Sequence, residues 1–147
     1  MLNNELDLSF NYEPILYKEI ECGSHEIKEG KKANLARMVK QGDINLLRAS
    51  REFDGKDNFF SERVQWKNDV PWTITASGSD IWIENLGYCI NDPEMISAST
   101  FPQDYNFCDT KVKYICGMSV PPIMIKRIVT RLIESGIFDY KLKEVGE

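Results

Sequence analysis

Apolar side chains recur at helical spacing near the C-terminal end of the chain. Between Pro121-Pro122 and Gly136 they form a stripe of five: Ile125, Ile128, Val129, Leu132 and Ile133. Positions three and four residues apart share one face of an α-helix, proline fits the first turn, and glycine commonly follows the last. The pattern predicts a long amphipathic helix whose apolar face packs within the chain; binding of that face to a partner is the alternative.

Two further helices are predicted from the same kind of signal. In residues 31–41, Leu35, Met38 and Val39 lie on one face and Gly42 follows as a stop. The other face of this helix would show basic side chains to solvent: Lys31, Lys32, Arg37 and Lys40. A second helix is expected from about residue 92 to residue 100. Asn91 or Asp92 can cap it, and Pro93 and Glu94 suit its first turn.

Short runs rich in β-branched and aromatic residues predict strands at 63–66, 72–76, 81–83 and 113–116. Residues 6–20 alternate loosely and contain Pro14, which suits an extended or edge element. The polar stretch 43–62 is expected to be a long loop in which Phe59 and Phe60 anchor the loop to the core, with stacking on bases as the alternative. The predicted fold class is α+β: a small mixed domain of short strands with a long C-terminal amphipathic helix.

Composition narrows the class of protein. The chain has 147 residues, about one domain, and a formal net charge of −5. A strongly basic nucleic-acid binder is therefore excluded as a description of the whole chain. Residues 18–67 nevertheless carry eleven basic and nine acidic side chains, so an anion-facing surface would lie there, unless the surface is simply of mixed sign. The acidic N-terminus and the lack of a long apolar run predict a cytoplasmic protein that does not span a membrane.

No catalytic constellation follows from the residues alone. The four cysteines (Cys22, Cys89, Cys108 and Cys116) lack zinc-knuckle spacing and are expected to be buried thiols. His25, the only histidine, lies in a Gly-Ser-His-Glu stretch and is expected to be an exposed loop residue. No phosphate-binding glycine loop is present. We therefore predict no catalytic residue and no metal ligand.

Residues 116–122 (CGMSVPP) form an unusual approach to the last predicted helix. A helix N-terminus offers free backbone N–H groups, and Ser119 adds a hydroxyl, so this end could receive a carboxylate or phosphate. Simple helix initiation explains the same residues equally well.

Three stretches resemble the C-terminal part of bacterial and phage cytosine-5 DNA methyltransferases, in the order found in that family. Residues 63–76 (RVQWKNDVPWTITA) resemble the ninth motif, and residues 94–105 (EMISASTFPQDY) resemble the segment that follows it. Residues 117–122 (GMSVPP) resemble the tenth motif, Gly-Asn-Ser/Ala-Val-Pro-Pro. The stretch 55–60 (GKDNFF) is also similar to the target-recognition segment of phage-type members. The resemblance implies a target-recognition lobe from a DNA-modifying transferase of a restriction–modification system.

The chain lacks the catalytic half of that family. Its members attack cytosine with a cysteine that follows proline, and none of the four cysteines here follows proline. The Glu-Asn-Val motif and the N-terminal Phe-x-Gly-x-Gly loop for S-adenosylmethionine are also missing. Because covalent catalysis needs the nucleophile, we expect no DNA methylation by this chain alone.

The resemblance also implies roles for individual residues. Ser119, with Met118 and Val120, would complete the S-adenosylmethionine pocket once a catalytic half is present; Met118 stands where the family has Asn. Arg63 and Thr73 would tie the recognition region together or contact the DNA backbone. Lys56 and Asn58 lie in the loop expected to approach DNA. Residues 1–76 would form the recognition region with the ninth-motif strand, and residues 77–147 the return segment with the C-terminal helix.

The expected partners are DNA and a second polypeptide. The final helix would leave its apolar stripe exposed without a catalytic lobe, so a catalytic partner subunit or self-association through this helix is expected to cover it. The leading hypothesis is the recognition part of a two-chain methyltransferase. The alternatives are a DNA-binding module or enzyme remnant with no catalytic role, and an unrelated structural or interaction protein.

Overall fold

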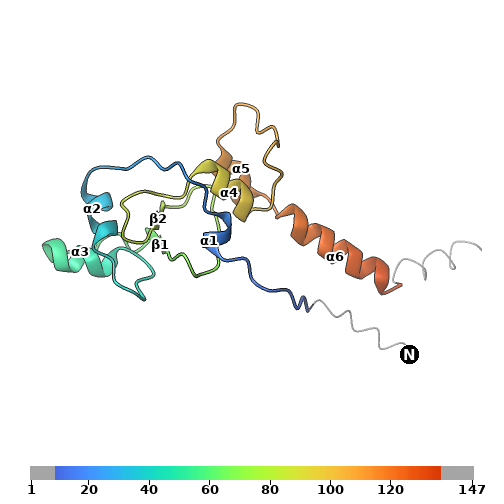
Figure 1. Ribbon diagram of the computed structural model, residues 1–147, viewed down its shortest axis with the longest axis horizontal. Helices are drawn as coiled ribbons and strands as arrows, with labels where there is room; N and C mark the ends of the chain where they lie inside the picture. Colours follow the sequence, from blue (N-terminus) through green and yellow to red (C-terminus); the bar gives the residue numbers. More distant parts are fainter. Residues whose placement is uncertain (1–8, 137–147) are drawn as a thin grey trace, which may run out of the picture.

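The computed structural model describes residues 9–136, which form a small mixed α/β domain with several helices and few strands. Figure 1 shows an elongated arrangement: α2 (Lys31–Arg37) and α3 (Leu47–Asp54) lie at one end, the two strands near the middle, and α6 (Pro122–Glu134) projects from the other. α1 (Tyr17–Ile20), α4 (Asp92–Ala98) and α5 (Val112–Met118) lie between the strands and α6. The predicted mixture of helices and short strands is confirmed.

The two strands, β1 (Arg63–Gln65) and β2 (Ile81–Ile83), pair in parallel with Arg63 opposite Ile81. They confirm the strands predicted at 63–66 and 81–83. β1 lies before and β2 after residue 76, so the sheet joins the two parts into which the chain was expected to divide. Residues 72–76 are not a strand, and that prediction is wrong. The Trp72 N–H donates to the side-chain oxygen of Gln65 at 2.9 Å instead of to a neighbouring strand.

The strand predicted at 113–116 is also wrong, because these residues lie within α5. Val112 and Cys116 are four residues apart, and the helix directs both into one apolar cluster with Ile74, Ile81 and Met95. A short run such as 113–116, in which three of four residues are apolar or aromatic, is ambiguous between strand and helix. Burial at the i, i+4 spacing decides it here.

Three predicted helices are confirmed in type. α2 ends at Arg37, earlier than expected, and Gly42 lies in a later turn with φ 94°. α4 begins as predicted: the Asn91 side chain accepts from the Glu94 N–H at 2.9 Å, and the Glu94 side chain accepts from the Asn91 N–H at 3.0 Å. This reciprocal capping box satisfies two backbone donors that a helix start leaves free. α6 begins at Pro122, also as predicted.

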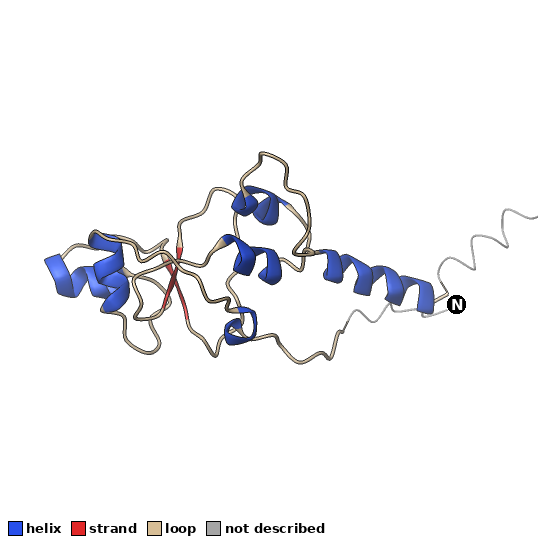
Figure 2. Ribbon diagram, turned by 45° about the horizontal axis from the view of Figure 1, so that its top comes forward, coloured by secondary structure: helices blue, strands red, loops and turns tan. Residues whose placement is uncertain are grey.

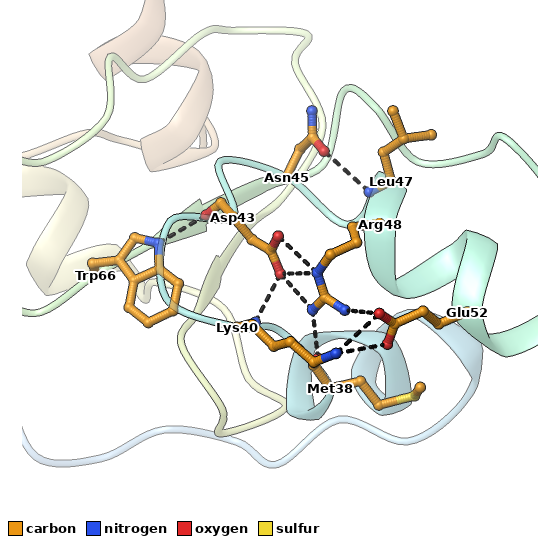
Figure 3. A network of polar contacts seen from close by, with 8 residues as sticks. All are labelled: Met38, Lys40, Asp43, Asn45, Leu47, Arg48, Glu52 and Trp66. Atoms are coloured by element: carbon orange, nitrogen blue, oxygen red, sulfur yellow. Dashed lines mark hydrogen bonds and ion pairs between the residues drawn. The ribbon is translucent and has the colours of Figure 1, made fainter.

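The long loop predicted at 43–62 is wrong, because it contains α3. Figure 3 shows the polar network that holds this helix. The Arg48 guanidinium donates to the Asp43 carboxylate, with its closest contact at 2.6 Å, and to the Met38 carbonyl at 2.8 Å. Glu52 lies 2.7 Å from Arg48 and 3.0 Å from the Lys40 ammonium. A polar segment is helical here because ion pairs stabilise it and Ala49 is buried in the core.

The N-terminal segment expected to be extended is irregular from residue 9 and then forms the single turn α1; residues 6–8 lie outside the described residues. The two aromatic residues of the loop differ in burial. Phe59 packs against the core, as predicted, whereas Phe60 is 68% exposed.

Two apolar clusters form the core. One joins α2, α3 and the strands: Ala33, Leu35, Ala36, Val39, Leu46, Ala49, Val64 and Trp82. The other joins β2 to α4 and α5 around Ile74, Ile81, Met95 and Cys116. α6 belongs to neither cluster and has no buried residue; Figure 2 shows it extending beyond the rest of the fold. None of the helices within residues 9–136 has the length and apolar character to cross a membrane.

Candidate functional site

A cleft of about 430 Å³ lies where the end of the ninth-motif-like segment meets β2, α4 and α5. Ile74, Ile81 and Met95 are buried and form its apolar floor. The other lining residues are largely polar or aromatic: Phe60, Ser61, Arg63, Trp72, Thr73, Thr75, Gly78, Ser79, Asp80, Cys89, Ile90 and Lys113. Two of the four predicted DNA-facing residues, Arg63 and Thr73, therefore lie in this cleft.

Arg63 is held at the cleft by an aromatic ring. Its guanidinium lies 5.0 Å from the centre of the Trp72 ring, within the range of a cation–π contact. The indole is itself fixed, because Trp72 Nε1 donates to the Val64 carbonyl at 2.7 Å. Among the described residues, no carboxylate lies within ion-pair distance of Arg63. Arg63 thus keeps hydrogen-bond donors available for an anion while its orientation is set by stacking.

Lys56 and Asn58 lie in the exposed loop that follows α3. Gly55 ends the helix in the left-handed conformation, with φ 73°, and the Lys56 N–H donates to the Asp54 carboxylate at 3.3 Å. The loop then returns to the cleft, where the hydroxyls of Ser61 and Ser79 are 2.8 Å apart. Lys56 and Asn58 are therefore exposed on the loop, whereas Arg63 and Thr73 line the cleft to which the loop leads.

Lys113 is a cleft residue that the sequence reasoning missed. Its ammonium donates to the Gly78 carbonyl at 2.8 Å and the Ser79 carbonyl at 3.2 Å, and it lies 3.6 Å from the Asp80 carboxylate. It fixes the turn after the ninth-motif-like segment onto α5. No pattern in the sequence could reveal this contact, because it joins residues more than thirty positions apart.

The predicted cofactor-facing residues lie at the junction of α5 and α6. Met118 is 67% exposed, and Val120 is also exposed. The Ser119 hydroxyl donates to the Ile115 carbonyl at 2.5 Å, so it satisfies the C-terminal end of α5. This junction therefore presents an exposed apolar edge formed by Met118 and Val120.

Gly117 fixes that junction against the cleft segment. A Cβ atom placed on Gly117 would lie 2.1 Å from the Ala76 nitrogen and 2.5 Å from the Thr75 carbonyl carbon. Only glycine allows this approach of two backbones. At the start of α6, the Ile123 N–H donates to the Thr100 hydroxyl at 3.1 Å. These contacts bring the three motif-like segments into one unit.

A second polar centre surrounds Glu94, which is only 1% exposed. Its carboxylate accepts hydrogen bonds from the Tyr17 hydroxyl at 2.8 Å and the Cys22 N–H at 3.2 Å, and contacts the His25 ring nitrogen at 2.8 Å. Burial and the hydrogen bond to Glu94 raise the pKa of Tyr17 far above its usual value. The centre joins the N-terminal segment to α4.

His25 lies in a loop, as expected, but the expectation that it is exposed is wrong. Its side chain is only 7% exposed and stacks on Tyr88, with ring centres 4.2 Å apart. The stretch around it contains glycine and serine, which are typical of loops, but the carboxylate that binds the imidazole comes from α4, 69 residues later.

Two of the four cysteines, Cys89 and Cys116, are disfavoured as nucleophiles by burial. Burial raises the pKa of the Cys89 thiol to about 11 and also raises that of Cys116, so both stay protonated at neutral pH. The expectation of buried thiols holds for Cys116; Cys22 and Cys89 are half-buried and Cys108 is exposed. Within residues 9–136, no cluster of three or more His, Cys, Asp or Glu side chains could hold a metal ion.

No protein-family model, curated protein or solved structure matches this chain.

Proposed function

We propose that the chain is the target-recognition and cofactor-pocket-completing part of a cytosine-5 DNA methyltransferase, acting with a separate catalytic half. The assembled enzyme would transfer the methyl group of S-adenosylmethionine to C5 of a DNA cytosine. The catalytic half would supply the nucleophile and the remainder of the cofactor pocket.

One observation carries the proposal: the three motif-like segments pack together in the fold. Gly117 packs on the Thr75–Ala76 backbone, and Thr100 accepts a hydrogen bond from Ile123, which directly follows the third segment. Ile74 and Met95 share an apolar cluster with Cys116, which directly precedes that segment. Such packing is what a common functional unit requires.

The cleft supports a role in DNA binding. Arg63 is oriented by Trp72, and Thr73, Ser61 and Ser79 supply hydroxyls beside it. Arginine and hydroxyl side chains are common partners of phosphate and base edges. Lys56 and Asn58 would extend this surface along the duplex. A buttressing role for Arg63 is compatible with the same geometry, since the Trp72 contact also connects β1 to the following segment.

A second polypeptide is supported by the cysteines, none of which follows proline, and by α6. Cys89 and Cys116 are held as thiols, so neither can provide the thiolate that attacks cytosine. Several apolar side chains of α6 are between 43% and 63% exposed: Ile123, Met124, Ile125, Val129 and Ile133. An uncovered apolar face of this kind favours a docking partner. S-adenosylmethionine would supply the methyl group, with Met118, Ser119 and Val120 closing one side of its pocket.

Stand-alone DNA binding is the weaker alternative. Most basic side chains near the middle of the chain are paired with carboxylates, among them Lys32 with Glu62 at 2.7 Å and Arg48 with Asp43 at 2.6 Å. Affinity for DNA depends largely on cations that neutralise phosphates. With a net charge of −5, the chain has few such cations to offer.

The first test is purification of the tagged chain from its source cells, with mass spectrometry of co-purifying proteins. We expect a stoichiometric partner that carries the Pro-Cys and Glu-Asn-Val motifs. The reconstituted pair should then transfer tritiated methyl groups from S-adenosylmethionine to DNA. Recovery of the chain alone, or a pair that transfers no methyl group, would reject the two-chain enzyme and favour a binding module or a remnant.

The cofactor assignment has its own test in the reconstituted pair. Ser119→Trp should abolish methyl transfer, because the indole would fill the cofactor-facing side of the α5–α6 junction. Thr110→Trp, at an exposed loop position, is the matched control and should stay active. Full activity of Ser119→Trp would show that the junction does not face the cofactor.

A further inference from the structure

The described N-terminal segment runs from α1 toward α6, as Figure 1 shows. We call residues 9–16 the strap. At one end the strap continues into α1, where Tyr17 is 1% exposed and its hydroxyl donates to Glu94. The Tyr17 N–H also donates to the Asp69 carbonyl at 2.9 Å. This end of the strap is therefore fixed to the core of the domain.

At its other end the strap contacts α6 through two aromatic rings. The Arg127 guanidinium lies 3.8 Å from the centre of the Tyr12 ring, and that of Arg131 lies 5.9 Å from the Phe10 ring. Both are cation–π distances. Arg131 also approaches the Ser9 carbonyl at 3.5 Å. These contacts tie the projecting helix back to the domain.

The spacing of the two rings matches the spacing of the two arginines. The Tyr12 N–H donates to the Phe10 carbonyl at 3.0 Å, a tight turn. The turn leaves the rings 6.4 Å apart and nearly parallel, at 16°. Arg127 and Arg131 are separated by four residues of helix, about 6 Å along its axis. Each ring therefore meets one guanidinium, and the pairing sets a register between strap and helix.

The strap contacts the polar side of α6. The cavity between them is lined on the helix by Ile123, Lys126, Arg127, Thr130, Arg131 and Glu134. At about 100° per residue, Ile125, Val129 and Ile133 lie on a different side, and each of them is exposed. The strap thus holds the helix without covering its apolar face.

We infer that the strap positions α6: Phe10 and Tyr12 grip Arg127 and Arg131, and so fix the direction in which the helix presents its apolar face to a partner. The start of α6 is held separately by the hydrogen bond from the Ile123 N–H to Thr100. Two attachment points, one at the first turn and one further along, define the direction of a helix that has no buried residue. The four side chains are positioning residues. The benefit to a partner rests on the function proposed above, whereas the grip itself does not.

The grip is tested on the chain alone by measuring the distance between two attached spin labels by electron paramagnetic resonance. One nitroxide is attached to the exposed Cys108 and the other to Val129→Cys, which is exposed on α6 outside the strap-lined cavity, with Cys22 and Cys89 replaced by serine. We expect a narrow distance distribution in this background and with Tyr12→Phe, which keeps the aromatic ring. Tyr12→Leu keeps an apolar side chain but removes the ring and should broaden the distribution. Equal widths for Tyr12→Phe and Tyr12→Leu would overturn the inference.

Two controls make this result specific. Tyr12 is 58% exposed, so its replacement should leave the urea midpoint of unfolding unchanged. Tyr114→Leu, which replaces a similarly exposed tyrosine on α5, should not broaden the distribution. If Tyr114→Leu broadens it as much as Tyr12→Leu does, the effect is not caused by the strap and the inference fails.

With the co-purified catalytic half, Tyr12→Leu should weaken association about two- to tenfold, the range expected for lost cation–π contacts. Turnover at saturating partner should be unchanged, because the strap does not touch the reacting atoms, and Tyr12→Phe should restore the affinity. Absence of any catalytic partner, together with the expected change in spin distances, would reject the proposed function and leave the strap intact. Unchanged spin distances would reject the strap whether or not the enzyme assembles.

Discussion

At the scale of single residues, the chain combines buried polar anchors with cations held in other ways, such as the half-buried Arg63. Glu94 is the clearest anchor, because one carboxylate receives donors from α1, from the Cys22 backbone and from the cap of its own helix. Arg63 differs from it, since stacking on Trp72 orients its guanidinium without neutralising it. Buried groups of the first kind stabilise the fold, whereas groups of the second kind are free to bind ligands.

Glu94→Gln should destabilise the chain by about 2–3 kcal/mol, because an amide replaces a carboxylate that accepts several hydrogen bonds in a buried site. The free energy of unfolding in urea measures the effect. Glu29→Gln, at an exposed position, is the control and should change it by no more than about 0.5 kcal/mol. Equal stability of the two variants would contradict the assignment of Glu94 as a structural anchor.

Lys56→Ala should weaken DNA binding by the assembled enzyme and reduce the slope of log affinity against log salt by about one, the loss of one phosphate contact. Fluorescence anisotropy across a salt series provides the slope. Lys40→Ala is matched to it, because Lys40 is also an exposed lysine but is paired with Glu52 at 3.0 Å; it should keep the original slope. An unchanged slope for Lys56→Ala would remove this loop from the DNA interface.

At the scale of elements, side-chain chemistry at the ends decides where helices lie. α3 is stabilised by the network of Arg48 with Asp43 and Glu52. Burial alone would raise the pKa of Asp43, but hydrogen bonds from Arg48 and from the Lys40 N–H outweigh burial and lower it. The folded state therefore favours the ionised carboxylate more than the unfolded state does.

This pKa shift makes the α3 region sensitive to acid. A carboxylate whose folded pKa is depressed stabilises the fold above its unfolded pKa of about 3.9. That stability is lost as the pH falls through the lower, folded pKa. Urea unfolding should thus become easier from about pH 4 downward, and Asp43→Asn should reduce this acid sensitivity. Asp109→Asn, in an exposed loop, should leave it unchanged; the same acid profile in both variants would refute the role of Asp43.

The joint between α5 and the cleft depends on Gly117. Gly117→Ala should destabilise the chain by about 2 kcal/mol or more, because its Cβ would overlap the Ala76 backbone. Gly23→Ala is a close control, since nothing lies within 4 Å of a Cβ at that position. Thermal unfolding of both variants measures the difference. A Gly117→Ala variant as stable as Gly23→Ala would mean that the two segments can separate at little cost.

At the scale of the whole molecule, the fold is elongated and asymmetric. Both apolar clusters lie in the part that holds the strands and α2 to α5, whereas α6 extends beyond them with no buried residue. A helix of this kind contributes little to the stability of the isolated chain. Its apolar side chains are therefore available for association.

Val129→Glu should disrupt association through α6 while leaving the stability of the domain within about 0.5 kcal/mol of the original. Thr130→Glu adds the same charge at the neighbouring position on the polar side and should preserve association. Sedimentation velocity of the chain alone, and of the chain with its catalytic half, distinguishes the two. Equal association of both variants would show that the apolar face of α6 is not the docking surface.

Local chemistry determined several elements from sequence alone. The Asn91–Glu94 capping box, the proline start of α6 and the β-branched and aromatic content around β1 are properties of neighbouring residues, so propensity and capping rules found them. The expectation that the apolar face of α6 packs within the chain is wrong, because none of its residues is buried. The partial exposure expected without a covering lobe agrees with the exposed Ile125, Val129 and Ile133. The assignments of Lys56, Asn58, Ser119 and Met118 to DNA and cofactor surfaces stay predictions.

Only the tertiary structure decided which residues far apart in the sequence contact one another. The segments 72–76 and 113–116 have strand-like composition, yet the side chain of Gln65 and the apolar cluster around Met95 give them other conformations. His25 lies in a loop, but contact with Glu94 of α4 keeps its ring from being exposed. Secondary-structure propensity and residue spacing depend on neighbouring positions in the sequence. Burial and ion pairing depend instead on which segments contact one another in the fold. At these sites burial and ion pairing outweighed local propensity.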